Sequence, residues 1–223
     1  MGWHVVAVSS DGRVFQLDLK AKKWSVLAGK SPLYKMTFPL VAFDDVREVL
    51  VLWRSAKSKG RKDDSLIFDG KKWFQPAKGA AANAKDLAVE GEGTFCLFFD
   101  PVVGRVMRVG VSSAASFDGQ KWVASTLKGA EHLDTWERII AVNPASKTVH
   151  SIHRFGYVNS IAQITCTADG VTVKAVGTLP SAVTRAPNST GSNVAFDAGV
   201  YDAANEQFLA FDVQKNERFS MSL

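Results

Sequence analysis

Short apolar runs separated by polar turns recur along this chain. Runs such as EVLVLW and TFCLFF are apolar at consecutive positions, and Asp-Gly pairs stand between runs at Asp11-Gly12, Asp69-Gly70 and Asp118-Gly119. An Asp-Gly pair between apolar runs indicates a β-hairpin, because glycine accepts the positive φ that a tight turn needs. Apolar residues at consecutive positions are expected of strands that are covered on both faces. The pattern therefore predicts antiparallel strands packed between neighbouring sheets.

One hairpin segment is repeated. LIFDGKKW, residues 66–73, returns as ASFDGQKW, residues 115–122, and a looser copy, VFQLDLKAKKW, ends at Trp24, so that successive Trp residues lie 49 positions apart. A fourth, degenerate copy, AQITCTADGVTVKAV, has Val173 where Trp is expected. Strand-turn-strand units at a period near 50 residues are typical of β-propellers.

A second family of hairpins alternates with the Trp hairpins. Its turns lie at Asp44, Asp100, Asn143 and Asp202. Each unit therefore has an inner strand pair followed by an outer pair that ends in Trp, which is the composition of a propeller blade. We expect a single all-β domain over residues 1–223, a β-propeller of four blades with four antiparallel strands each. Five smaller blades are the alternative.

A closed ring accounts for both ends of the repeat. The first Trp hairpin has no Asp hairpin before it, and the last Asp hairpin has no Trp hairpin after it. A row of blades would leave two apolar end faces exposed, whereas a ring buries both. We therefore expect strands from the two termini to complete one shared blade.

The two hairpin types also resemble a known family. YDAANEQFLAF and FDPVVGRVMRV, together with Trp hairpins of the type FDGxxW, are similar to kelch-type repeats, and the resemblance covers nearly the whole chain. The Gly-Gly doublet that usually ends the second kelch strand is absent, since its position reads LWRS, RVGVSS and IHRFG. The resemblance implies a propeller that acts as an interaction module; a minority of such propellers are enzymes or sugar-binding proteins.

The long connections between strands are expected on one face of the propeller, opposite the tight turns. Loops held by a rigid scaffold commonly carry function. The predicted partner-binding residues on this face are Trp53, Arg54, Lys57, Lys59, Arg61, Lys62, His153, Arg154 and Tyr157. Clustered basic side chains favour carboxylate or phosphate groups, so a protein partner of acidic character is the main hypothesis. A solvated loop without a partner is the other interpretation.

Nucleic acid fits this basic segment less well than an acidic protein does. Binding of nucleic acid usually combines a basic track with stacking aromatic side chains, and few aromatic residues accompany this one. Asp63 and Asp64 also offset part of its charge.

The repeated Trp residues have two interpretations. They could stack on sugars in equivalent pockets, as in a propeller lectin, or pack between blades. Val173 keeps the apolar character of the repeat but loses the ring, which favours packing. A carbohydrate-binding lectin is therefore the first alternative function.

Catalytic and metal-binding motifs are absent from the sequence. It has no GxSxG, no glycine-rich phosphate loop and no HExxH. Carboxylates from distant loops could still meet at the ring axis, with Glu90, Glu92, Glu131 and Asp134 as candidates, so an enzyme is the second alternative. His150 and His153 lie three positions apart and point to opposite faces of a strand, so we expect no metal site and no cofactor.

Composition adds little to this picture. The net charge of +5 agrees with an acidic partner without requiring one.

No apolar run approaches the roughly 18–20 residues of a membrane span, and the first residues lack the basic and apolar regions of a signal peptide, so a cytoplasmic protein is expected. Cys96 and Cys166 lie in apolar, strand-like segments and are expected to be buried free thiols.

Overall fold

The computed structural model describes residues 5–9, 12–18, 20–29, 40–54, 64–77, 96–110, 113–133, 138–143, 145–155, 158–178, 198–202, 205, 207–212 and 217–222. Apart from one 3-10 turn, η2 (Ala130–His132), the regular structure in these ranges is β-strand. Within the same ranges, no helix is long and apolar enough to cross a membrane. The prediction of an all-β chain is confirmed.

The strands pair into five antiparallel groups along the chain. The first group is β1 (Val5–Val8), β2 (Val14–Asp18) and β3 (Lys23–Ala28). The second is β4 (Leu40–Asp44), β5 (Val49–Arg54), β6 (Asp64–Phe68) and β7 (Trp73–Phe74). The third is β8 (Cys96–Asp100), β9 (Arg105–Val109), β10 (Ala114–Phe117) and β11 (Trp122–Lys128).

The chain continues with two more groups. The fourth is β12 (Arg138–Asn143), β13 (Thr148–Phe155), β14 (Val158–Cys166) and β15 (Gly170–Thr178). The fifth is β16 (Ala198–Asp202), β17 (Gln207–Asp212) and β18 (Glu217–Ser222).

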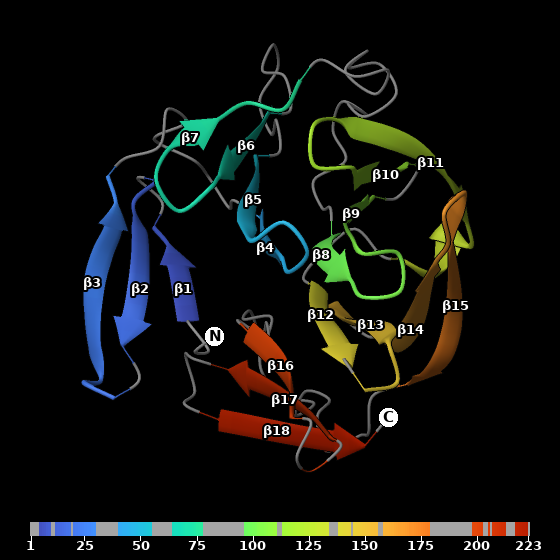
Figure 1. Ribbon diagram of the computed structural model, residues 1–223. Coiled ribbons are helices and arrows are strands. Elements are labelled where there is room, and N and C mark those ends of the chain that lie inside the picture. Colours follow the sequence, from blue (N-terminus) through green and yellow to red (C-terminus); the bar gives the residue numbers. More distant parts are fainter. Residues whose placement is uncertain are drawn as a thin grey trace.

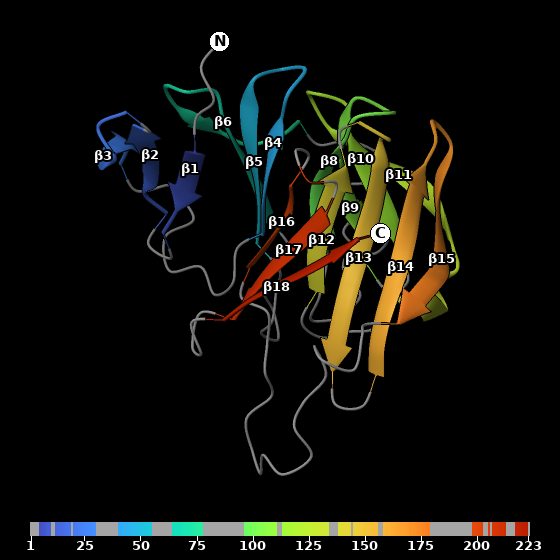
Figure 2. The same cartoon turned by 90° about the horizontal axis from the view of Figure 1, so that it is seen from below.

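The groups are arranged radially. Figure 1 shows them around a common centre, with each first strand near the centre and each last strand at the rim. The innermost strands are neighbours in succession: β4 contacts β8, β8 contacts β12, and β12 contacts β16. Radial repetition of small antiparallel sheets is the β-propeller architecture. Seen from the side, many tight hairpin turns lie at one end of the propeller, the top of Figure 2. We call this end the tight-turn face.

The order of hairpins along the chain agrees with the sequence. In the second and third groups, the inner pair turns after Asp44 or Asp100, and the outer pair turns after Asp69 or Asp118. The predicted alternation of inner and outer hairpins is confirmed there.

The expected shared terminal blade is wrong for the described strands. β1–β3 and β16–β18 form separate three-stranded sheets. The physical reason is that β1 pairs with the first Trp hairpin and β18 pairs with the last Asp hairpin. Each chain end therefore builds a group of its own, which the prediction of four blades did not include.

Aspartate and asparagine side chains close most of these hairpins. Oδ1 of Asp69 accepts hydrogen bonds from the N–H groups of Lys71 (2.9 Å) and Lys72 (2.8 Å). The same double acceptance by Oδ1 occurs at Asp18, Asp44, Asp100, Asp118 and Asn143. Such Asx turns imitate a backbone turn and hold the chain reversal in one conformation. The repeated Asp of the sequence is therefore a structural residue of the tight-turn face.

The fourth outer hairpin uses a different cap, which corrects one sequence assignment. Thr167 replaces the aspartate: its Oγ1 accepts the N–H of Gly170 at 3.2 Å. Phe117 pairs with Trp122, and Cys166 pairs with Val171 in the same way. The residue in the Trp position is therefore Val171 and not Val173. The loss of both Asp and Trp explains why this copy is degenerate.

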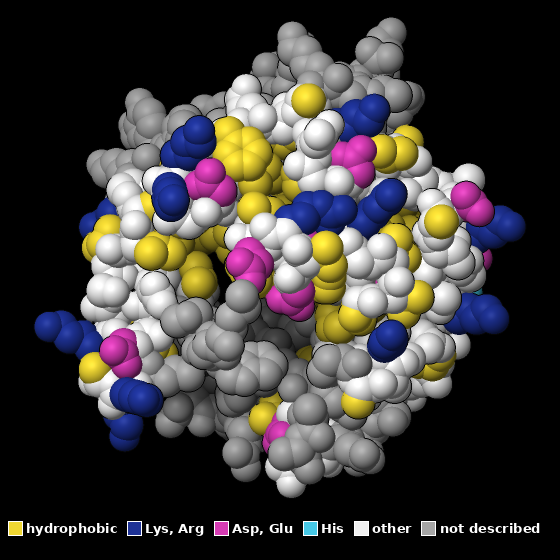
Figure 3. All heavy atoms as spheres, viewed as in Figure 1, with side chains coloured by type: hydrophobic (Ala, Val, Ile, Leu, Met, Phe, Trp, Pro, Cys, Tyr) yellow, Lys and Arg dark blue, Asp and Glu magenta, His cyan; other side chains and the backbone are white. Residues whose placement is uncertain are grey.

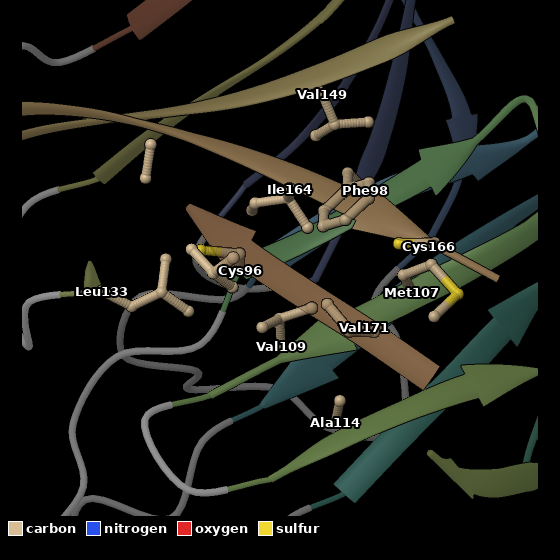
Figure 4. Close-up of a cluster of buried hydrophobic side chains, with 12 residues drawn as sticks. Cys96, Phe98, Met107, Val109, Ala114, Leu133, Val149, Ile164, Cys166 and Val171 are labelled. Carbon is tan, nitrogen blue, oxygen red and sulfur yellow. The ribbon is translucent and has the colours of Figure 1, made fainter. Parts of the chain in front are cut away.

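Apolar side chains fill the wedges between neighbouring groups. Between the second and third groups, Val51 and Ile67 pack with Val106 and Phe117. The opposite face of the second group carries Leu50 and Phe68, which pack against the first group. A strand with core residues on both faces is what EVLVLW predicted. Figure 4 shows the corresponding wedge between the third and fourth groups, with labelled side chains Cys96, Phe98, Met107, Val109, Ala114, Leu133, Val149, Ile164, Cys166 and Val171.

The two cysteines are buried free thiols, as predicted. Burial raises the pKa of the Cys166 thiol well above its ordinary value, and the adjacent Asp100 carboxylate, which accepts its hydrogen bond, raises it further. Cys166 therefore remains a neutral packing residue at physiological pH.

The repeated Trp side chains are buried to different degrees. Trp122 is 6% exposed, lies 5.5 Å from the Phe117 ring, and donates a 2.9 Å hydrogen bond to Ser65 of the second group. Trp73 is half-buried beside Phe68 at 5.1 Å. Trp24, on the last strand of the first group, is 47% exposed. The packing interpretation is confirmed for Trp122 and partly for Trp73, and it is wrong for Trp24.

The rims of the third and fourth groups are joined by a parallel strand pair. Thr126, Leu127 and Lys128 of β11 pair with Gly170, Val171 and Thr172 of β15, which makes one sheet of eight strands. Two glycines allow this close approach. Gly129 has φ +74°, and a Cβ there would overlap the backbone oxygen of Val173. A Cβ on Gly170 would overlap Oγ1 of Thr126.

We predict that Gly129→Ala destabilises the protein by about 1–3 kcal/mol, because alanine is strained at this φ and its Cβ meets backbone that cannot rotate away. Gly177→Ala, in β15 and with open space around its Cβ, is the control and should change stability by less than about 0.5 kcal/mol. Chemical denaturation of the two variants measures the difference. Equal stability of both variants would show that the joined rim contributes nothing to folding.

Candidate functional site

A pocket lies where the innermost strands of three groups meet near the propeller axis. Its volume is about 370 Å³. The walls come from β4, β8 and β12, and the lining residues are Val41, Ala42, Phe43, Asp45, Leu97, Phe98, Phe99, Pro101, Ile140 and Val142. Because Asp45 and Pro101 belong to hairpin turns, the pocket lies toward the tight-turn face. This volume is within the usual range for small-molecule sites. We call it the axial pocket.

β4 contributes exposed apolar side chains to the pocket. Val41 and Phe43 are 38% and 46% exposed, whereas Ala42 and Asp44 are buried between the groups. Side chains alternate along a strand, so the two exposed residues share one face of β4, and both line the pocket together with Ala42 of the other face. At the adjacent turn tips, Val46 and Val102 are exposed as well. Figure 3 shows this side of the molecule, where hydrophobic, acidic and basic side chains all reach the surface near its centre.

The walls also offer backbone hydrogen-bonding groups. Among the described strands, β4, β8 and β12 are each at the edge of their sheet. An edge strand presents N–H and C=O groups on its unpaired side. A ligand in the axial pocket could therefore bind both apolar side chains and main-chain polar groups.

Asp45 is the charged residue in the lining. It follows the turn-capping Asp44, and its side chain is exposed at the pocket. Partial desolvation raises the pKa of the Asp45 carboxyl, and the negative charge of Asp44 raises it further. Titratable groups with such shifts are often found at functional sites. The pocket therefore combines apolar walls with one carboxylate.

Arg47 links the β4–β5 turn to the β8–β9 turn beside the axial pocket. Its Nη1 donates to Oδ2 of the buried Asp44 at 2.9 Å and to the backbone oxygen of Gly104 at 3.1 Å. Gly104 belongs to the β8–β9 turn, so the contact joins the second and third groups. The guanidinium group also lies against Gly119, where a Cβ would overlap it. The mouth of the axial pocket is thus braced before any ligand binds.

The predicted partner-binding residues have different outcomes. Trp53 is 3% exposed, with its ring 5.2 Å from that of Trp122 and the Arg108 guanidinium 4.5 Å above it. It is a core residue, and its assignment to a partner surface is corrected for that reason. The side chains of Arg54, Lys57, Lys59, Arg61, Lys62, His153, Arg154 and Tyr157 lie outside the described part of the structure. For these residues, the acidic-partner hypothesis stays a prediction.

The pocket residues Val41, Phe43, Asp45 and Phe99 are not among the site residues that the sequence predicts. A signal was present in the segment LVAFDD, where the turn uses Asp44 and leaves Asp45 without a capping role. The apolar residues of this segment form one strand of a predicted inner hairpin. Which of them lie at the axis depends on how the groups are arranged, and a single strand pattern does not contain that information.

The described residues contain no group of three His, Cys, Asp or Glu side chains that could hold a metal ion. Of the carboxylates proposed to converge at the axis, Glu131 lies in η2 beside His132, at 3.9 Å, and not in the axial pocket. Glu90, Glu92 and Asp134 lie outside the described residues.

Comparison with known proteins supports the fold alone. No protein-family model matches the chain, and no curated protein matches its sequence. The chain is similar to an auxiliary nutrient binding protein from Bacteroides thetaiotaomicron, with 11% identity and a TM-score of 0.60, over 98% of this chain and 52% of that one. The same values describe an auxiliary nutrient binding protein from Bacteroides ovatus. Hydrazine synthase from Kuenenia stuttgartiensis has 10% identity and a TM-score of 0.52, over 99% and 68% of the two chains.

The chain thus spans about half the length of the two nutrient binding proteins, at 52% of each. Identities of 10–11% carry no information about ligands. The kelch resemblance has no matching family model, so it stays a prediction, while the β-propeller architecture is seen in the structure itself.

We predict that Arg47→Met lowers the free energy of unfolding by about 1–3 kcal/mol, because the buried Asp44 carboxylate loses its charged partner and the two turns lose their link. Lys71→Met is the control, since this exposed turn residue contributes only its backbone N–H to the Asp69 cap. Chemical denaturation compares the two variants. An Arg47→Met protein as stable as Lys71→Met would contradict the bracing role.

We further predict that Asp45→Asn raises the melting temperature at pH 7. A carboxyl whose pKa is raised by folding is destabilising when ionised, and this penalty disappears as the pH falls below about 4. The other titratable groups, including the neighbouring Asp44, are the same in both proteins. The gain in melting temperature should therefore shrink between pH 7 and pH 3.5. A lower melting temperature of the variant at pH 7 would contradict the assignment.

Proposed function

We propose that this chain is a five-bladed β-propeller that works as a non-enzymatic binding module and holds an apolar ligand group in the axial pocket. The observation that carries the proposal is the exposure of Val41 and Phe43, at 38% and 46%, on the wall of a pocket of about 370 Å³. Large apolar side chains exposed together in a concave site are typical of ligand-binding surfaces.

The chemistry of the lining supports binding more than catalysis. Of the ten described residues that line the pocket, nine are apolar, and Asp45 is the remaining one. Hydrolytic acid–base catalysis by carboxylates generally uses a second carboxyl, histidine or comparable group within reach of the first. The described residues of the lining supply no such pair. Apolar walls with a single polar group instead orient a bound ligand.

The braced turns support the same proposal. Arg47 and the Asx turns after Asp44 and Asp100 hold the pocket mouth in place. A site that is already formed loses less conformational entropy when a ligand binds.

The lectin alternative has less support from the described residues. Repeated sugar sites would need equivalent Trp rings, but Trp122 is 6% exposed whereas Trp24 is 47% exposed. Rings that differ so much in accessibility do not form equivalent stacking platforms.

We predict that benzyl alcohol, a small neutral aromatic probe, binds in the axial pocket with a dissociation constant in the millimolar range or below, as expected for so few heavy atoms. Val41→Trp should weaken binding at least about fivefold, because the indole ring occupies part of the pocket. Val123→Trp is the matched control, since Val123 is exposed to nearly the same extent, 37% against 38%, on the outer strand β11. Ligand-observed NMR titration measures all three proteins.

Two outcomes would contradict the proposal. One is the absence of saturable binding to the unmodified protein. The other is equal weakening by both Trp variants, which would show that the probe does not enter the axial pocket. Thermal unfolding of each variant establishes that it is folded before the titration.

A further inference from the structure

We infer that the axial pocket selects an organic cation, an ammonium group attached to an apolar body, with Asp45 as the charge-pairing residue. This inference rests on the proposed function and names the ligand class. It follows from three features of the pocket: the position of Asp45, the ion pairs and hydrogen bonds that neighbouring charged side chains already make, and the aromatic rings in the wall.

The first feature is the position of the carboxylate. Asp45 lines the pocket beside Phe43, whereas the other acidic residues of this hairpin, Asp44 and Glu48, are not part of the lining. Asp44 is buried and occupied by the turn and by Arg47. A ligand in the axial pocket therefore meets the carboxylate of Asp45.

The second feature is that the nearby arginine side chains bind groups other than Asp45. Arg47 binds Asp44 and the oxygen of Gly104, and Arg105 donates to Ser116 at 3.4 Å. Within the part of the chain that the structure describes, no ion pair or hydrogen bond neutralises Asp45. A bound cation would supply the missing partner, whereas an anion would meet the charge of Asp45 and that of Asp44 behind it.

The third feature is aromatic. Phe43 and Phe99 both belong to the lining. The face of an aromatic ring attracts cations, most strongly for quaternary ammonium groups that are only weakly hydrated. An ammonium group on an apolar body can then contact a ring and a carboxylate while its apolar part lies against Val41, Leu97 and Ile140. Neutral and anionic ligands of the same shape lack one or both of these contacts.

The pKa of Asp45 agrees with this assignment. Desolvation and Asp44 both disfavour the ionised carboxyl, so the negative charge of Asp45 lies in an unfavourable place. A bound cation relieves that penalty, which adds to its selectivity over a neutral ligand.

The experiment compares three probes that share a phenyl ring and differ in the charge and size of the head group: benzyltrimethylammonium, benzyl alcohol and benzoate. For the unmodified protein, we expect benzyltrimethylammonium to bind about tenfold tighter than benzyl alcohol, from a carboxylate contact and a cation–π contact together. Benzoate should bind more weakly than benzyl alcohol. Titrations at pH 7 and constant ionic strength, followed by ligand-observed NMR or calorimetry, give the three dissociation constants.

Asp45→Asn should reduce the preference for the cation over benzyl alcohol to about threefold or less. Glu48→Gln is the matched control: it removes a carboxylate of the same hairpin that does not line the pocket, and it should keep the preference. Equal affinities of the unmodified protein for cation and alcohol would overturn the inference, and so would equal losses in the two variants. In either case, benzyl alcohol binding that is sensitive to Val41→Trp still supports the proposed function. Failure of all three probes to bind would overturn both.

Discussion

The structure depends on one constraint: the second and third groups of strands are apolar on both faces and pack between two neighbours. Val51 and Ile67 on one side of the second group, and Leu50 and Phe68 on the other, show this within a single sheet. Wedges packed in this way arrange the groups around an axis, because every face except the inner edge is then covered. The axial pocket is a consequence, since the innermost strands approach one another without pairing.

The hairpin turns make the tight-turn face of the propeller rigid. Side-chain oxygens of Asp and Asn close one turn after another in the same way, and at Asp44 and Asp100 the capping residue is itself buried. A buried carboxylate is tolerated when its oxygens are all bonded. At Asp44, Arg47 completes that requirement and reaches the next group through Gly104. The same contacts that stabilise the fold therefore also hold the mouth of the pocket.

Much of the fold could be predicted from the sequence, because short segments of the chain determine its strands and turns. Asp-Gly turns, the 49-residue spacing of Trp and the alternation of two hairpins are properties of short segments. Features that depend on contacts between distant segments could not be predicted. The equivalence of Val171 to Trp122 is visible only in the pairing register, and the separate terminal groups only in the pairing of β1 and β18. The axial pocket belongs to this second class: Val41 and Phe43 have the pattern of core residues, and their exposure is set by three strands that are far apart in sequence.

The arrangement at the axis is unfavourable for stability alone, which is the reason to assign function there. A chain selected only for folding would gain by placing a neutral residue at Asp45 and smaller or polar residues at the exposed positions of β4. Instead, a carboxylate lies beside Asp44, and large apolar side chains remain accessible to water. Exposed apolar side chains and a carboxylate that occur together in one pocket are characteristic of functional sites. Trp24 is the contrasting case: it is exposed on the outer strand of a single sheet, and no carboxylate or second wall accompanies it in a described pocket.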